Sequence, residues 1–249
     1  MNEITPQYHY SLLSRNTFGI DAAAHCFIEY TSEEGLLQAI AFHRHEWPRL
    51  PLLHIGGGSN LLFMHDFPGT ILHSAILGVQ PMAQEEDKVL VRVGAGMKWD
   101  EWVEYSLSRG WYGLENLSLI PGEVGASAVQ NIGAYGAEAA QYIEKVECVD
   151  LTDGSLRTFD VAECEYGYRH SVFKTKFQGR YAVTHVWFRL SLAFAPNLSY
   201  HGLTAALEAQ GKPSASLTAQ DIRQTVISVR RQKLPDPEQL GNAGSFFMN

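Results

Sequence analysis

The sequence has few cysteines and no long hydrophobic run, and each shortage excludes a class of protein. Its three cysteines, Cys26, Cys148 and Cys164, are odd in number and form no C-x-x-C pair, so neither a disulfide framework nor a zinc template fits. We expect reduced thiols, as in the cytoplasm. No run of about 18 apolar residues occurs, and residues 1–10 are polar, so we predict neither a transmembrane helix nor a secretory signal.

Basic residues are also scarce. The 249 residues include 19 Lys and Arg against 27 Asp and Glu, which gives a formal net charge of −8. This balance disfavours nucleic acid or an anionic membrane as a partner, although a local cationic pocket remains compatible with an anionic small molecule. The 10 histidines form no H-E-x-x-H or similar cluster, so no metal site is predicted.

Hydrophobic periodicity predicts a mixed fold of the α+β class. A helix is expected after a capping box at 31–34, and other helices at 99–107, 202–210 and 218–232. Strands are expected at 25–30, 52–55 and 89–93, with a hairpin over 143–159 and a central strand over 181–194. Residues 113–136 show no clear periodicity, and we expect an irregular but ordered stretch there.

A first glycine-rich loop follows the strand predicted at 52–55. Glycines at 56–58 allow the backbone to approach a ligand closely, so consecutive N–H groups can converge on a phosphate. Ser59 and Asn60 add side-chain donors. The loop has neither the lysine of a Walker A motif nor the spacing of a Rossmann loop. A plain tight turn is the alternative.

A second glycine-rich segment covers residues 120–136 and includes Ser127, Gln130 and Asn131. Such a segment can wrap a flat polar ligand with backbone hydrogen bonds, or simply pack against a sheet. Two such loops in one chain favour a ligand of dinucleotide size.

Basic side chains occur at two further places. Arg169 follows Tyr168 and can hold a carboxylate through two hydrogen bonds, or it can be a surface arginine stacked on that tyrosine. Arg230 and Lys233 lie at the end of a predicted helix. Cations at this end interact favourably with the helix dipole, or they can contact a phosphate. Ser245 lies in no G-x-S-x-G elbow, which disfavours an acyl nucleophile but leaves a proton donor possible.

Taken in order, seven stretches resemble the UDP-N-acetylenolpyruvoylglucosamine reductase family, the FAD enzymes of bacterial peptidoglycan precursor synthesis. The stretches are residues 16–20, 57–62, 113–122, 130–136, 167–174, 233–237 and 241–247. The resemblance implies a fold of the vanillyl-alcohol-oxidase (PCMH) type. It predicts FAD-binding subdomains at 1–75 and 76–234, and the start of a largely missing substrate domain at 235–249.

The resemblance also implies which residues contact non-covalent FAD, with residues 57–61 as the pyrophosphate loop. The expected contacts are Gly56, Gly57, Gly58, Ser59, Asn60, Leu61, Pro121, Gly122, Gly125, Ser127, Asn131, Ile132, Gly133, Ala134 and Arg230. The positions on the side of the substrate or NADPH are Tyr168, Tyr200, Lys233 and Asn249.

The implied reaction passes hydride from NADPH through the flavin to the enolpyruvyl ether of a UDP-sugar. The family's proton donor corresponds to Ser245, and its arginine that polarises the substrate carboxylate corresponds to Arg169. A cytoplasmic monomer is expected.

The family's chain continues beyond the Ser245 motif to a late catalytic glutamate, for which this sequence has no counterpart. Two alternatives therefore stay open, a flavin-binding fragment without turnover and a related flavin oxidase.

Overall fold

The computed structural model describes residues 4–212, 216–236 and 239–242, and two larger sheets organise them. The first sheet has the order β1-β2-β4-β3. Both β2 and β3 run parallel to β4, whereas β1 is antiparallel to β2. Its strands are β1 (Gln7–Ser11), β2 (Ala23–Tyr30), β3 (Leu52–Ile55) and β4 (Phe67–Ser74).

Helix α1 (Glu33–Glu46) joins β2 to β3. Its N-cap is Ser32 and not Thr31, so the capping box predicted at 31–34 does not form. The Ser32 side chain accepts a hydrogen bond from the Gly35 N–H at 3.0 Å, which satisfies a donor that the helix itself cannot pair. The buried face of α1 packs on both sheets. That shared core includes Ile28 and Leu72 from the first sheet, Leu36 and Ile40 from the helix, and Val149 and Ala182 from the second sheet.

The second sheet has the order β10-β9-β11-β6-β5, and all its neighbouring strands are antiparallel. Strand β11 is central, as predicted, although it ends at Ser191. Helix α2 (Trp99–Ser108) packs its fully buried Trp99 and Trp102 near Phe188 of β11. The strands are β5 (Val79–Gln84), β6 (Lys88–Gly94), β9 (Ile143–Asp150), β10 (Leu156–Asp160) and β11 (Tyr181–Ser191).

The expectation of an irregular stretch over 113–136 is wrong in part. Val124–Gln130 forms helix α3, which at seven residues is too short to show a clear period. Asn131 ends the helix in the left-handed region with φ of 45°. A small hairpin of β7 (Gly133–Ala134) and β8 (Ala137–Glu138) follows.

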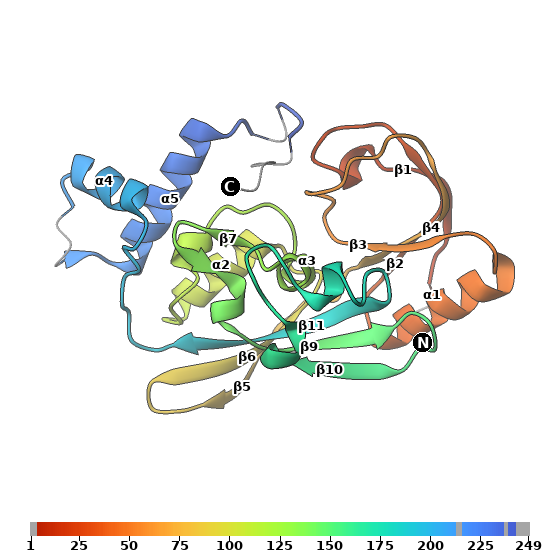
Figure 1. Cartoon of the computed structure of the whole chain (residues 1–249), viewed down its shortest axis with the longest axis horizontal. Helices are drawn as coiled ribbons and strands as arrows, with labels where there is room; N and C mark the ends of the chain where they lie inside the picture. Colours follow the sequence, from red (N-terminus) through yellow and green to blue (C-terminus); the bar gives the residue numbers. More distant parts are fainter. Residues whose placement is uncertain (1–3, 213–215, 237–238, 243–249) are drawn as a thin grey trace.

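Helices α4 (His201–Ala209) and α5 (Ala219–Lys233) pack on each other around a small core of their own. They lie at the opposite end of the molecule from α1 (Figure 1). A capping box starts α5, in which Thr218 and Asp221 exchange side-chain and backbone hydrogen bonds.

The mixed α+β architecture confirms the predicted class, while the subdomain limits at 75 and 234 stay a prediction. The three cysteines are buried and form no disulfide, as expected. Within the described part of the chain, no helix has the length and apolar character needed to cross a membrane.

Candidate functional site

A cleft of about 510 Å³ brings together the two glycine-rich loops, the turn that carries Arg169 and the end of α5. This volume lies in the range of small-molecule sites. Of the predicted site residues, those that line it are Ser59, Asn60, Pro121, Ser127, Ile132, Gly133, Ala134, Tyr168, Arg169, Tyr200, Arg230 and Lys233. Eight further lining residues were not among the individually predicted contacts, although five of them lie in the second glycine-rich segment: Trp99, Ile120, Glu123, Ala126, Gln130, Tyr135, Lys174 and Leu234.

The two glycine-rich loops meet directly at one side of this cleft. Ser59 Oγ donates to the Pro121 carbonyl oxygen at 3.3 Å, and Asn60 Nδ2 donates to Gln130 Oε1 at 3.0 Å. A Cβ on Gly57 would lie only 3.7 Å from the Gly122 Cα. Larger side chains here would fill the space between the loops, so the glycines fit a cradle in which backbone approaches a ligand.

The other predicted FAD contacts among the described residues do not line the cleft: Gly56, Gly57, Gly58, Leu61, Gly122, Gly125 and Asn131. Gly125 packs on Ala95, where an added Cβ would lie 2.9 Å from the alanine Cβ. The Asn131 side chain donates to the Gly167 carbonyl oxygen and accepts from the Ala140 N–H, at 2.8 and 2.9 Å. Asn131 therefore holds the turn that precedes Arg169.

The cleft is cationic in an acidic protein. Its described lining includes Arg169, Lys174, Arg230 and Lys233 but a single acidic residue, Glu123. Arg230 Nε donates to the Leu119 carbonyl oxygen at 3.1 Å, which fixes the guanidinium at the cleft wall. Burial lowers the pKa of Arg230, and contacts with Tyr135 and Asp100 oppose this shift.

Arg169 lies in a tight turn in which Gly167 and His170 exchange backbone hydrogen bonds. Its backbone φ of 49° is left-handed, and its guanidinium carbon lies 5.9 Å from the ring centroid of Tyr168. On the facing side, Tyr200 makes an edge contact with Tyr135, with ring centroids 5.4 Å apart. Ser245 and Asn249 lie outside the described residues.

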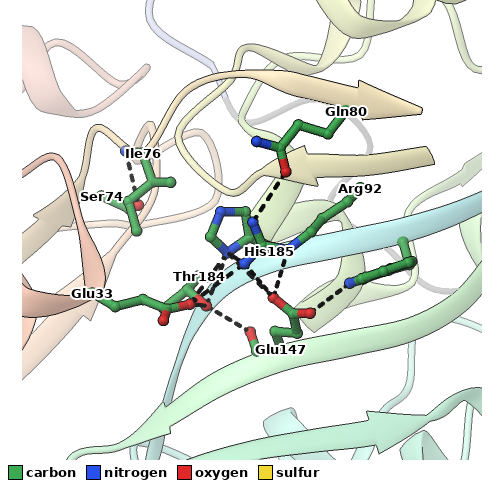
Figure 2. A network of polar contacts seen from close by, with 9 residues as sticks. Glu33, Ser74, Ile76, Gln80, Arg92, Glu147, Thr184 and His185 are labelled. Carbon is green, nitrogen blue, oxygen red and sulfur yellow. Dashed lines mark hydrogen bonds and ion pairs between the residues drawn. The ribbon is translucent and has the colours of Figure 1, made fainter. Parts of the chain in front are cut away.

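One group of possible metal ligands occurs among the described residues, formed by Glu33, Glu147 and His185. Figure 2 shows that Arg92 lies within this group. Its Nη2 is 2.6 Å from Glu147 Oε2, 2.8 Å from His185 Nδ1 and 3.7 Å from Glu33 Oε1. The guanidinium already supplies the positive charge that a metal ion would bring, so this group is an internal ion network that joins α1 to the second sheet.

Comparison with known proteins adds two findings on sequence. The sequence matches the FAD binding domain family over residues 24–160. It is 52% identical to UDP-N-acetylenolpyruvoylglucosamine reductase from Bacteroides fragilis over 240 residues, which are 96% of this chain and 70% of that protein.

Solved structures show the same fold. UDP-N-acetylenolpyruvylglucosamine reductase from Thermus caldophilus aligns with a TM-score of 0.69 at 22% identity, over 99% of this chain and 75% of that one. Cholesterol oxidase from Brevibacterium sterolicum aligns with a TM-score of 0.55 at 13% identity, over 77% of this chain and 38% of that one. The predicted FAD-binding fold is thereby confirmed.

Proposed function

Because the chain belongs to the UDP-N-acetylenolpyruvoylglucosamine reductase family, we propose that it reduces the enolpyruvyl ether of UDP-N-acetylglucosamine to UDP-N-acetylmuramate. In this proposal NADPH is the reductant and the step belongs to peptidoglycan precursor synthesis. FAD, held by the glycine-rich loops and Arg230, would supply the hydride-transfer chemistry that links NADPH to the double bond of the substrate.

The observation that carries the proposal is the cationic cleft at the meeting of the two glycine-rich loops. FAD, NADPH and a UDP-sugar each carry a diphosphate, and the enolpyruvyl group adds a carboxylate. Four cationic side chains in an otherwise acidic protein suit such ligands, because charge-assisted hydrogen bonds to phosphate and carboxylate are the strong ones. Ser59 and Asn60 belong to the expected pyrophosphate loop, and Arg230, which also lines the cleft, is a further expected flavin contact.

Arg169 has the chemistry to stabilise the reacting carboxylate. Hydride addition to the enol ether builds negative charge beside that carboxylate, and a fixed guanidinium stabilises such charge in the transition state. The left-handed turn holds the Arg169 backbone, while Lys174 Nζ donates to its carbonyl oxygen at 3.0 Å. Ser245 would deliver the proton to the adjacent carbon.

The remaining predicted residues would hold the substrate or NADPH. Tyr168 and Tyr200 offer rings and hydroxyls at the cleft mouth, where both are exposed. Lys233 suits a diphosphate or a carboxylate as a compact charge. Asn249 completes the expected set.

Flavin retention tests the cofactor half of the proposal. The purified chain, incubated with FAD and desalted, is expected to keep a visible flavin band. Arg230→Met is expected to lose the band because it removes a cation from the cleft. Arg231→Met is the matched control, since Arg231 is the exposed neighbour of Arg230 on α5 and does not line the cleft. Loss of flavin from both variants alike, or from neither, would contradict the role given to Arg230.

Turnover tests the catalytic half. NADPH oxidation that depends on the enolpyruvyl substrate is expected, and Arg169→Met is expected to lower kcat by about 100- to 1,000-fold while keeping the flavin. Retained flavin without turnover would instead support the alternative of a flavin-binding fragment. Oxygen consumption driven by a sugar or alcohol would support the alternative of a flavin oxidase.

A further inference from the structure

Four charged or titratable side chains form a continuous line from the first sheet to the cleft, and we call them the Glu123 network. They are Arg15 from the short 3-10 helix between β1 and β2 (Leu13–Arg15), Glu29 from β2, His73 from β4 and Glu123 from the start of α3. His73 Nε2 lies 2.9 Å from Glu123 Oε1, and His73 Nδ1 lies 3.0 Å from Glu29 Oε2. Arg15 Nη2 lies 2.9 Å from the same Glu29 oxygen.

With a neutral His73 and two ionised carboxylates, the network has too few hydrogen-bond donors for the contacts of His73. One additional proton is needed. An ionised carboxylate only accepts hydrogen bonds, and a neutral imidazole has a single N–H. His73 nevertheless faces a carboxylate oxygen with each ring nitrogen. The contact of Arg15 Nη1 with His73 Nδ1, at 3.4 Å, does not resolve this, because the Glu29 oxygen lies closer. Both contacts are satisfied when the imidazole is doubly protonated or one carboxyl group keeps its proton.

Water reaches one end of the network, where the Arg15 and Glu29 side chains are 25% and 40% exposed, but the His73 and Glu123 end is buried. The His73 and Glu123 side chains are 6% and 11% exposed, so a net charge there is costly. With the additional proton, the two carboxylates are balanced by Arg15 and the imidazole. Without it, one negative charge remains uncompensated.

The Glu123 end of the network touches the loop that the proposed function assigns to the pyrophosphate. A Cβ on Gly56 would lie 3.2 Å from Glu123 Oε2, and one on Gly57 would lie 3.5 Å from Glu123 Oε1. Glu123 is also the acidic member of the described cleft lining. An uncompensated negative charge at this position repels a diphosphate.

We propose that the Glu123 network holds one proton that favours binding of the FAD diphosphate, so that flavin binding and protonation of the network reinforce each other. The inference rests on the proposed function, since it takes FAD as the ligand. By linkage, a ligand that binds better to the protonated network also raises the network's affinity for the proton.

Three other titratable groups lie close by. Tyr10 of β1 accepts a hydrogen bond from Arg15 Nε at 3.2 Å, and the other two, Tyr30 and His54, do not compete for this role. The Tyr30 hydroxyl of β2 lies 2.6 Å from His54 Nε2 of β3. Burial, with a smaller effect from His73, lowers the pKa of His54 to about 4, and burial raises the pKa of Tyr30. Both groups therefore stay neutral around pH 7.

The test is a titration of the chain with FAD between about pH 6 and pH 9. For the natural sequence we expect Kd to rise as the network loses its proton, by up to about tenfold per pH unit. Glu123→Gln is expected to flatten this dependence, because a glutamine amide both donates and accepts and adds no charge. Glu86→Gln is the matched control, since it removes the same charge from an exposed hairpin turn and should keep the original profile.

Each outcome decides between the two ideas. Equal pH profiles for the natural chain and Glu123→Gln overturn the role of the network, whereas absence of flavin binding at every pH overturns the proposed function instead. Should Glu123→Gln not fold, calorimetry of the natural chain in buffers of different ionisation enthalpy gives the same answer. At a pH within the range over which Kd rises, proton uptake on flavin binding supports the proposal, and binding without proton exchange overturns it.

Discussion

Replacing Gly58 by alanine tests whether the folded backbone itself requires glycine at this position, independently of any bound ligand. Gly58 has a φ of 65°, and an added Cβ would lie 1.8 Å from the Arg15 carbonyl oxygen. The left-handed backbone alone costs alanine about 1–2 kcal/mol. Relief of an overlap with packed atoms adds about 1–3 kcal/mol. We therefore expect Gly58→Ala to lower the free energy of unfolding by about 2–5 kcal/mol.

Gly179→Ala supplies a matched control within the same chain. Gly179 has a similar φ of 72°, but nothing lies within 4 Å of its added Cβ. Its cost is therefore the backbone term alone, about 1–2 kcal/mol. At about 2–4 °C per kcal/mol for a chain of this size, Gly58→Ala should melt about 2–12 °C below Gly179→Ala in a thermal scan followed by circular dichroism. Equal melting temperatures would refute the argument that the first loop packs too closely on Arg15 to admit a side chain.

Three further predictions concern the stability of the folded chain. Arg223→Met should cost about 3 kcal/mol in urea unfolding, because the 6% exposed guanidinium binds both oxygens of Asp100 at 2.6 and 3.0 Å; an unchanged midpoint would contradict this. Burial raises the pKa of Glu115, so the unfolded chain releases that proton first and stability should fall as pH rises through the range between the unfolded and folded pKa values. Glu115→Gln should reduce that fall in urea midpoints measured across acidic and neutral pH, and an unaltered slope would exclude Glu115 as its source. A metal chelator should leave the melting temperature unchanged, since Arg92 already neutralises Glu147; a large drop would indicate a bound ion.

Local signals predicted much of the secondary structure. The Thr218 capping box and the Gly110 that follows α2 are features of adjacent residues, and their geometry does not depend on the rest of the fold. The Asp-Gly turn between β9 and β10 is of the same kind, with Gly154 at a φ of 82°. The apolar residues on both faces of β11 correctly indicated a central strand.

Long-range partners could not be predicted in this way. Arg223 and Asp100 are 123 residues apart, and His73 and Glu123 are 50 apart. The hydrophobic periodicity of one segment carries no information about which charged residue of a distant segment will lie beside it in the fold. Residue patterns indicated the two glycine-rich segments and the basic side chains, and the resemblance supplied their individual roles. Glu123 was not named, because a carboxylate beside a glycine resembles one on the surface when only the sequence is known. The Pro-Gly that precedes Glu123 was the available signal for a constrained position.

The core shared by the two sheets has a consequence for how ligands enter. Leu36 and Ile40 of α1 lie buried against Val149 and Ala182 of the second sheet, and Arg92 joins Glu33 to Glu147 beside them. Hinged separation of the two sheets would expose these side chains to water at a cost of about 25 cal/mol per Å². The walls of the cleft are therefore held at a fixed spacing. The exposed side chains of Tyr168 and Tyr200 line the cleft outside this core, so a ligand that displaced them would leave the packing between the sheets intact.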